Sequence, residues 1–347
     1  MTTQLEKEIK EQPEAIARTL EESRAPVEKL CRDIRARDID YVMIAARGTS
    51  DNAGVYAKYI LPAFNGLPVA LAAPSLFTFY KKPPRLKNVL VLGISQSGQS
   101  EDIVEVMTAA RAQGALTAAI TTDLSSPIAR TADHGLHLAT GVEKAVAASK
   151  TFTSSLALLA QLSVTLEGDK DRRASLDALP GLMASACTMA AEAVPPRAER
   201  YRYMDRCAII ARGYAYAIAF EIALKLKELT YVTALPYSSA DFMHGPIAIV
   251  EPGFPVMVIA PRGELLPHLK EFTEQAAARQ AELLVVSNSE EMLALAEARF
   301  PIPDSIPEWL APVVSVVPGQ FLALHLSLAK GINPDVPRGL KKVTVTR

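Results

Sequence analysis

The sequence predicts an α/β protein with two tandem, doubly wound parallel sheets that are related by internal duplication. Short apolar segments alternate with helix-like segments along the chain, which is typical of parallel sheets covered by helices on both faces. An apolar segment closed by Arg-Gly also occurs twice, at 40–48 and 206–213, so that Gly213 follows Gly48 by 165 residues. The length of 347 residues fits two domains of roughly 150 residues each.

Two further pairs of apolar segments recur near this offset and in the same order. The segment 89–94 corresponds to 256–259, and 116–120 corresponds to 283–286. We expect each to be a buried strand, and we expect ligands beyond the carboxyl ends of the strands, where open sheets of this class bind them. Two unrelated α/β domains with similar strands are the alternative.

Proline, glycine and charge divide the chain into four expected parts. The first is charged and helical, with breaks at Pro13 and Pro26, and Pro195-Pro196 marks the boundary between the two α/β halves. The last is mostly irregular because it carries two prolines and two glycines. The parts are an N-terminal helical arm at 1–37, a first α/β domain at 38–190, a second at 191–330 and a C-terminal tail at 331–347.

Composition excludes several classes of function. Lys and Arg total 37 against 38 Asp and Glu, and a net charge of -1 leaves no basic surface for nucleic acid or anionic lipid. Cys31, Cys187 and Cys207 are far apart and odd in number, which argues against a disulfide framework and a zinc cluster. No apolar run approaches the ~18 residues of a membrane span, and the first residues lack the layout of a signal peptide. We therefore expect a cytoplasmic protein with no membrane partner.

The clearest candidate binding turn follows the segment 89–94. Its polar residues are Ser95, Gln96, Ser97 and Ser100. Free N–H groups at the start of the next helix attract an anion, serine hydroxyls add donors, and Gly98 lets the backbone approach closely. Because the turn lacks the Walker lysine and the chain lacks G-x-G-x-x-G, we expect a small phosphate ester rather than a nucleotide. Capping of the helix by Ser97 or Ser100 is the alternative.

A second polar turn follows the segment 40–48. Its Thr49 and Ser50 can donate hydrogen bonds to the same ligand from the neighbouring strand. Taken alone, this turn is explained equally well by ordinary N-capping of a helix.

A helical segment in the second half carries a candidate general base. Glu221, Lys225 and Glu228 are spaced at i, i+4 and i+7, so they share one helix face. Such spacing is usually a solvated row of ion pairs. The surrounding residues are mostly apolar, however, and a carboxylate among apolar side chains has a raised pKa and can act as a base near neutral pH.

The histidines give weaker signals. His244 precedes a Gly-Pro turn, where a structural role is as plausible as a catalytic one. His134 and His137 suggest a metal pair, but they lack acidic or cysteine ligands at suitable spacing. We expect no metal and no other cofactor.

Together these segments resemble the sugar isomerase (SIS) domain family, from about Asp38 to the C-terminus. The resemblance is to the isomerase half of glutamine–fructose-6-phosphate amidotransferases and to stand-alone glucosamine-6-phosphate deaminases of the same fold. It implies two flavodoxin-like subdomains. The motifs that carry it are Arg47-Gly48-Thr49-Ser50, Ser95-Gln96-Ser97-Gly98, Ala147-Ala148-Ser149-Lys150, the segment 221–228, His244-Gly245-Pro246 and the segment 337–344.

The resemblance implies binding roles for the polar turns. The matching positions are Ser95, Gln96, Ser97 and Ser100 for the phosphate cradle, Thr49 and Ser50 for a sugar-contacting turn, and Ala147 and Ser149 for further substrate contacts. Ala148, Met243 and Leu235 depart from the residue types common in the family.

The resemblance also implies catalytic roles. Glu228 matches the base that moves a proton between C1 and C2 of the open-chain sugar, and Lys225 matches a polar neighbour of that base. His244 matches a histidine linked to ring opening, which in these relatives comes from the other subunit of a dimer. Lys342 matches a tail lysine that engages the ketose carbonyl. We therefore expect a homodimer with shared active sites.

The chain has no segment resembling a glutaminase domain, so the resemblance implies deamination of glucosamine 6-phosphate to fructose 6-phosphate and ammonia. Three alternatives stay open: a phosphosugar isomerase without nitrogen chemistry, a phosphosugar sensor that turns nothing over, and a sugar-phosphate-binding subunit of a larger assembly. The first ~37 residues are too short for the DNA-binding domain that such sensors carry.

Overall fold

The computed structural model describes residues 2–342, which divide into two compact units. The first-sheet unit contains residues 14–143, 150–177 and 341–342, and the second-sheet unit contains residues 2–13, 144–149 and 178–340. The helical arm expected at 1–37 therefore contributes to both units.

The first sheet is parallel throughout and has the strand order β2-β1-β3-β4-β5. This is the flavodoxin-like order, in which the chain reverses direction across the sheet between β1 and β3. The segments expected at 89–94 and 116–120 are both buried strands. The strands are β1 (Tyr41–Ala45), β2 (Val69–Leu71), β3 (Val89–Ile94), β4 (Leu116–Thr121) and β5 (His134–His137).

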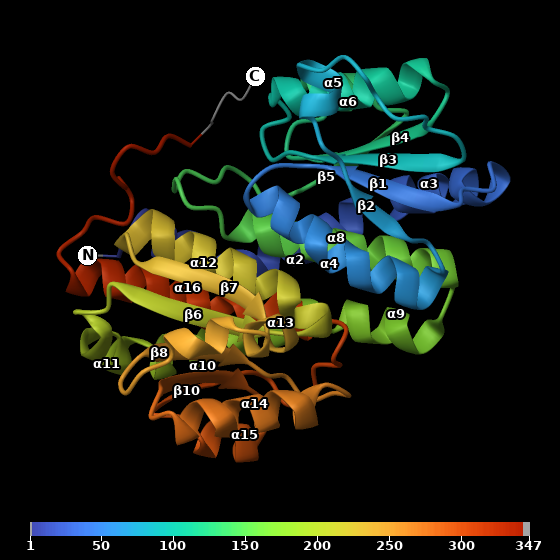
Figure 1. The fold of residues 1–347 in the computed structure, drawn as a ribbon. Helices are drawn as coiled ribbons and strands as arrows, with labels where there is room; N and C mark the ends of the chain where they lie inside the picture. The colour runs from blue at the N-terminus through green and yellow to red at the C-terminus, as the bar shows by residue number, and fades with distance from the viewer. Residues whose placement is uncertain (1, 343–347) are drawn as a thin grey trace. The chain divides into compact units, whose positions relative to one another are not determined.

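Helices cover both faces of this sheet. In Figure 1, α6 lies on one face and α3, α4 and α8 lie on the other. Apolar side chains such as Val91, Val106 and Met107 form the core between α6 and the strands. The helices are α2 (Gln12–Glu22), which begins in the second-sheet unit, α3 (Arg24–Ala36), α4 (Thr49–Asn65), α5 (Ser75–Thr78), α6 (Glu101–Ala112), α7 (Pro127–Thr131), α8 (Lys150–Glu167) and α9 (Lys170–Asp177). Pro13 and Pro26 fall in the first turns of α2 and α3, where proline is tolerated, so the predicted breaks are confirmed.

The second sheet repeats this topology. Its order, β10-β9-β8-β6-β7, is the same as that of the first sheet when its strands are numbered from β6, and all its strands are parallel. Together with the matching segments in the sequence, the repeated topology confirms two tandem doubly wound subdomains. The strands are β6 (Arg206–Ala211), β7 (Thr233–Ser238), β8 (Pro255–Ile259), β9 (Glu282–Ser287) and β10 (Ala298–Pro301).

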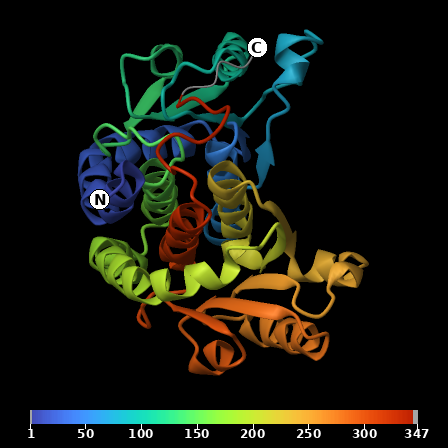
Figure 2. The same cartoon turned by 90° about the vertical axis from the view of Figure 1, so that its left-hand side faces the viewer.

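Helices also cover both faces of the second sheet. Figure 2 shows α10, α12 and α16 on one face and α14 and α15 on the other. The helices are α1 (Gln4–Lys10), α10 (Leu179–Ala193), α11 (Pro195–Ala198), α12 (Tyr216–Thr230), α13 (Ser239–Met243), α14 (Leu266–Ala278), α15 (Glu290–Ala294) and α16 (Ala311–Ala329), with 3-10 turns η1 (Glu199–Tyr201), η2 (Gly213–Ala215) and η3 (Pro246–Ile249).

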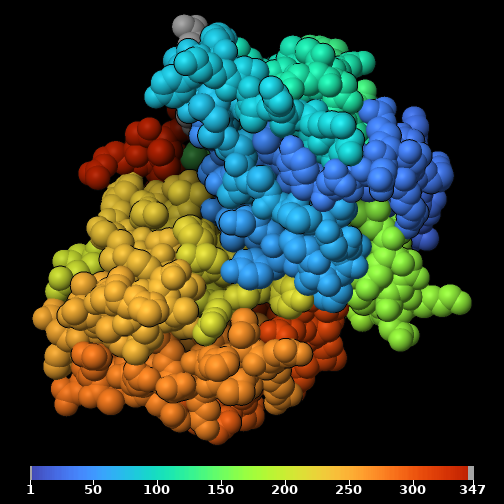
Figure 3. Space-filling model, turned by 45° about the vertical axis from the view of Figure 1, so that its right-hand side comes forward, coloured from blue at the N-terminus to red at the C-terminus, as the bar shows by residue number. Residues whose placement is uncertain are grey.

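The helix α16 is long and apolar enough to cross a membrane, although Ser, Gln and His interrupt its apolar run. In the protein, 89% of its most apolar window is buried, which is the behaviour of a core helix in a globular unit. The tail after α16 has no helix or strand up to residue 342, as expected, and part of it is visible in dark red at the surface in Figure 3.

Candidate functional site

The two predicted binding turns of the first-sheet unit lie at the same edge of the sheet. Strands β1 and β3 are neighbours, and Ala45 pairs in register with Gly93. The turn that contains Thr49 and Ser50 therefore emerges beside the turn that begins at Ser95. This is the carboxyl edge, where an open α/β sheet binds its ligand.

The turn after β3 is a compact loop with its hydroxyl groups close together. The Gly98 amide donates to Ser95 Oγ over 3.2 Å, and Ser95 Oγ lies 3.4 Å from Ser100 Oγ. Gly98 has φ +64, a conformation that favours glycine. Ser100 is the N-cap of α6 but makes no side-chain capping hydrogen bond, and Ser97 Oγ accepts only from the nearby Gln99 amide (3.3 Å). Capping therefore does not account for this cluster.

The loop is fastened to the end of β4 through one carbonyl group. The Gln96 carbonyl accepts hydrogen bonds from Thr121 Oγ1 (3.0 Å), Thr122 Oγ1 (2.8 Å) and the Thr122 amide (3.1 Å). Three donors on one oxygen hold the backbone of the turn in place before any ligand arrives. Such preorganisation lowers the free-energy cost of binding.

The turn after β1 is tied to α6 by an ion pair that the sequence analysis missed. Arg47 Nε donates to Asp102 Oδ2 over 2.7 Å, and the Asp102 side chain is 1% exposed. Thr49 and Ser50 follow in the first turn of α4 and are half-buried. An arginine after one strand and an aspartate in the helix after its neighbour are the only sequence signals for this pair.

A cavity of about 570 Å³ in the first-sheet unit opens onto this edge. Gln96 and Ser97 of the phosphate turn line it, and so does the tail residue Lys342. Ser95, Ser100, Thr49 and Ser50 are not among its lining residues. The other lining residues are Arg18, Glu22, Thr122, His137, Leu138, Ala139, Gly141, Val142 and Glu143.

Lys342 is held in the cavity by a carboxylate that the sequence analysis did not single out. Its Nζ lies 2.8 Å from Glu143 Oε2, and the Glu143 side chain is 0% exposed while that of Lys342 is 23% exposed. The remaining residues of the tail motif, Val343 and Thr344, lie outside the described residues.

His134 and His137 both pair with carboxylates on the N-terminal helices. His134 Nε2 lies 2.8 Å from Asp33 Oδ2, and His137 Nδ1 lies 2.8 Å from Glu22 Oε2. These pairs tie β5 to α3 and α2. Among residues 2–342, no group of three or more His, Cys, Asp and Glu is arranged to hold a metal ion.

The helix α12 in the second-sheet unit carries the predicted base in a buried charge cluster. Lys225 Nζ lies 2.6 Å from Glu228 Oε2 and 3.4 Å from Glu221 Oε1. The side chains of Glu221 and Lys225 are 0% and 3% exposed, whereas that of Glu228 is 24% exposed. A solvated row of ion pairs is therefore excluded, and Glu228 is the member of the cluster with the most access to solvent.

The other predicted residues of the second-sheet unit differ in exposure. His244 is the exposed C-cap of α13 and is followed by Gly245, with φ +135. Ala147 and Ser149 are 1% and 0% exposed. Their short segment is fixed by Glu8, whose carboxylate accepts from the Lys144 and Ala145 amides. The binding roles of Ala147 and Ser149 stay predictions.

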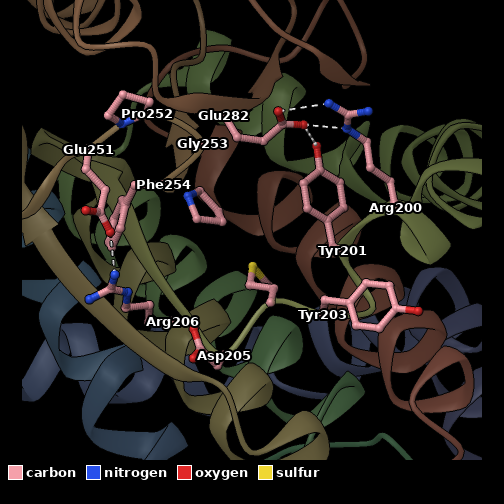
Figure 4. Close-up of a pocket in the computed structure, with 12 residues that line it drawn as sticks. Arg200, Tyr201, Tyr203, Asp205, Arg206, Glu251, Pro252, Gly253, Phe254 and Glu282 are labelled. Carbon is pink, nitrogen blue, oxygen red and sulfur yellow. Dashed lines mark hydrogen bonds and ion pairs between the residues drawn. The ribbon is translucent and has the colours of Figure 1, made fainter.

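A second cavity, of about 450 Å³, lies at the amino ends of β6, β8 and β9 (Figure 4). Four of its charged residues form two ion pairs. Glu282 accepts from Arg200 Nε (2.6 Å) and Tyr201 Oη (3.1 Å), and Glu251 pairs with Arg206 (2.5 Å). Because sheets of this class bind ligands at the carboxyl ends, this cavity is not the candidate sugar site.

Known proteins resemble this chain in sequence along almost its whole length. The family model described as "SIS domain" matches residues 37–165 and 202–330. A glutamine–fructose-6-phosphate aminotransferase [isomerizing] from Pectobacterium atrosepticum is 34% identical over 358 aligned positions, which cover 98% of this chain. The chain spans 58% of that relative's length.

Two solved structures resemble nearly the whole chain. A protein from Silicibacter pomeroyi, provisionally named a phosphosugar isomerase, has a TM-score of 0.86 at 33% identity and covers 96% of this chain and 100% of its own. The C-terminal domain of a glucosamine-fructose-6-phosphate aminotransferase from Francisella tularensis has a TM-score of 0.87 at 27% identity, with coverage of 97% and 99%.

Proposed function

The chain belongs to the SIS domain family, and from this premise we propose that it converts glucosamine 6-phosphate and water into fructose 6-phosphate and ammonia. The family assignment covers both α/β halves, and the name of the Silicibacter protein supports a phosphosugar substrate. The choice of an aminosugar substrate and the release of ammonia are the parts that we propose.

One observation carries the proposal. Gln96 and Ser97 of the serine turn and the amine of Lys342 line the same cavity of about 570 Å³. Its volume lies within the range of about 300–1,000 Å³ that is common for small-molecule sites. Hydroxyl and amide donors suit a phosphate group, and an amine suits the carbonyl oxygen of an open-chain sugar.

Binding of the phosphate supplies energy at a point remote from the reacting carbons, which the enzyme can use to orient them. In the reaction, a base removes the proton from C2 and a proton is returned to C1. The C1 aldehyde becomes an alcohol and the C2 amine becomes an imine. Water then adds to C2, ammonia leaves, and the ketone of fructose 6-phosphate remains.

We assign the base to Glu228. Its ion pair with Lys225 supports this role, because the contact of 2.6 Å holds the Glu228 carboxylate in a fixed position while its side chain stays 24% exposed. We assign stabilisation of the carbonyl oxygen to Lys342 and opening of the sugar ring to His244. The name of the Pectobacterium relative, which joins fructose 6-phosphate with isomerisation, supports the same sugar skeleton for this chain.

An isomerase without nitrogen chemistry is the second candidate. The name of the Silicibacter protein, which this chain matches along almost its whole length, favours it. The two candidates share the phosphate turn, the base and the proton transfer between C1 and C2. They differ only in whether C2 of the substrate carries an amine.

Measurement of ammonia release tests the proposal. Wild-type protein supplied with glucosamine 6-phosphate should produce ammonia and fructose 6-phosphate in equal amounts, and Glu228→Gln should produce neither. Interconversion of another aldose and ketose phosphate without ammonia release would favour the second candidate. Tight binding of sugar phosphates without any turnover would reject both.

We also propose a cytoplasmic homodimer in which His244 serves the partner's site. The exposure of His244 beside the exposed Met243 supports this assembly. Mixed dimers of His244→Ala and Glu228→Ala chains should regain part of the activity, because one of their two sites is complete. No recovery after proven subunit exchange would contradict a shared site.

A further inference from the structure

Glu143 is a fully buried carboxylate at the start of a helix. Its Oε1 accepts from the Thr151 amide (3.2 Å), and its Oε2 accepts from the Thr151 hydroxyl (2.8 Å). Thr151 lies in the first turn of α8. A negative charge at a helix N-terminus is stabilised by the helix dipole and by free amide groups, so this position suits an ionised carboxylate.

The loop that carries Glu143 is fixed independently of the tail. Lys150, which is 2% exposed, donates from Nζ to the carbonyl of Val142 over 2.9 Å. This contact holds the residue before Glu143 against α8, and the contacts of Thr151 hold the Glu143 side chain there. The carboxylate is therefore a preformed anchor.

Lys342 has the opposite character. It lies on an irregular tail, and its long side chain loses rotamer entropy when it is fixed in one position. A contact that offsets this loss of entropy must be strong. A buried carboxylate is such a partner, because removal of one member of a buried pair leaves an uncompensated charge.

We propose that Glu143 is the positioning residue for Lys342: it holds the amine in the cavity that Gln96 and Ser97 also line, at the point where it meets the sugar carbonyl. The part that Lys342 plays in the reaction rests on the proposed function. The contact between Glu143 and Lys342, called the tether below, does not rest on it, because the contact forms in the chain without substrate.

Glu143→Gln is the direct test, because glutamine keeps the shape but loses the charge. The substitution should lower kcat for the phosphosugar by about 10-fold to 100-fold, the size of effect that a misplaced catalytic group produces. It should leave KM within about 3-fold, because phosphate binding is unaffected and 3-fold is less than 1 kcal/mol. Glu143→Asp should lie between wild type and Glu143→Gln. Glu105→Gln, which removes an exposed carboxylate paired with Lys81 in the same unit, is the matched control and should have wild-type kinetics.

A double-mutant cycle separates positioning from a general structural role. If Glu143 acts through Lys342, Glu143→Gln should cause no further loss of kcat in a Lys342→Ala background. Additive losses would overturn the proposal. So would wild-type kinetics in Glu143→Gln.

Limited trypsin digestion provides a readout that needs no activity. Mass spectrometry measures the rate of cleavage after Lys341. This rate should be at least about 5-fold higher in Glu143→Gln than in wild type, and it should be unchanged in Glu105→Gln. A 5-fold increase corresponds to about 1 kcal/mol of lost stabilisation by the contact between Glu143 and Lys342. If Glu143→Gln fails to fold, Lys342→Ala breaks the same pair from the tail side and should show the same acceleration. Unchanged cleavage in a folded variant would overturn the tether. Absence of turnover in wild type, with accelerated cleavage in the variants, would reject the proposed function and leave the tether standing.

Discussion

Gly98 is the residue on which the shape of the phosphate turn depends. Its φ is +64, and a Cβ placed on it would lie 2.1 Å from Ser126 Oγ and 2.4 Å from Ser126 Cβ. Both the backbone conformation and the space therefore require glycine.

We predict that Gly98→Ala destabilises the protein and removes phosphate binding. Gly114→Ala is the matched control, since Gly114 also has a positive φ (+81) but no atom within 4 Å of its Cβ position. Gly98→Ala should cost about 1–3 kcal/mol more than Gly114→Ala in urea unfolding, which is the usual cost of overpacking. Thermal stabilisation by inorganic phosphate should be lost only in Gly98→Ala. Equal stability of the two variants would mean that Ser126 moves aside freely.

The ion pair between Glu282 and Arg200, at the amino end of the second sheet, makes the stability of the protein depend on pH. The hydrogen bond from Arg200 holds the pKa of the Glu282 carboxyl below its ordinary value. A lowered folded-state pKa contributes stability above the unfolded pKa, and this contribution is lost as the pH falls through the folded value. Urea midpoints measured between about pH 6 and pH 3 should therefore decline more steeply for wild type than for Glu282→Gln. If the urea midpoints of the two proteins fall in parallel with pH, Arg200 does not stabilise the ionised Glu282 carboxylate. Glu199→Gln, which removes an exposed carboxylate, is the control.

At the scale of elements, α12 and α16 pack unusually closely. A Cβ on Gly319 of α16 would lie 2.4 Å from two atoms of Ile222 on α12. This close approach helps to bury the face of α12 that also carries Glu221 and Lys225.

We predict that Gly319→Ala costs about 1–3 kcal/mol of unfolding free energy because the two helices must separate. Combined with Ile222→Ala, the loss should be smaller than the sum of the two single losses, since Ile222→Ala removes the clashing atoms. Gly181→Ala on α10, where no atom lies within 4 Å, should be neutral or stabilising by up to about 1 kcal/mol. A Gly319→Ala variant as stable as wild type would contradict the close packing.

The charge cluster of α12 supports a second prediction at this scale. Lys225→Met leaves the buried Glu221 and the half-buried Glu228 without their shared cation, and we expect the free energy of unfolding to fall by about 3–5 kcal/mol. Lys227→Met, two residues away and exposed, should change stability by less than about 0.5 kcal/mol. Urea denaturation of the two variants measures the difference, and similar values for both would contradict the importance of the cluster.

At the scale of the whole molecule, neither compact unit is built from one continuous stretch of chain. The chain changes unit near residues 13, 143, 149, 177 and 340. Because the chain passes between the units five times, we expect the two to unfold together.

The three buried cysteines report on both units. Burial raises the pKa of the Cys31 and Cys207 thiols to about 12, so almost no thiolate is available near pH 8. Cys31 lies in the first-sheet unit, and Cys187 and Cys207 lie in the second-sheet unit. Thiol labelling followed by mass spectrometry should show all three becoming reactive at the same urea concentration. Earlier exposure of Cys31 alone would mean that the units unfold separately.

Much of the fold could be predicted because it follows from local patterns of apolar and polar residues. The apolar segments at 89–94 and 116–120 are buried strands, and the repeat at an offset of 165 residues corresponds to two sheets of the same order. Local spacing also predicts the serine turn and the helix face that Glu221, Lys225 and Glu228 share.

The partners of these residues could not be predicted in the same way. Glu143 and Lys342 are 199 positions apart, and Arg47 and Asp102 are 55 apart. No periodicity connects such positions, since a side-chain contact between them depends on how strands and tail are arranged in space.

The sequence by itself determined the α/β class, the duplicated strand pattern and the polar turns that end the strands, because strand burial and turn chemistry follow from neighbouring residues. Only the tertiary structure decided that Gln96, Ser97 and Lys342 line one cavity, that Glu143 holds the tail lysine there, and that the charges of α12 are buried rather than solvated. Burial and long-range ion pairs depend on which distant segments exclude water from a group, and that is a property of the folded chain alone.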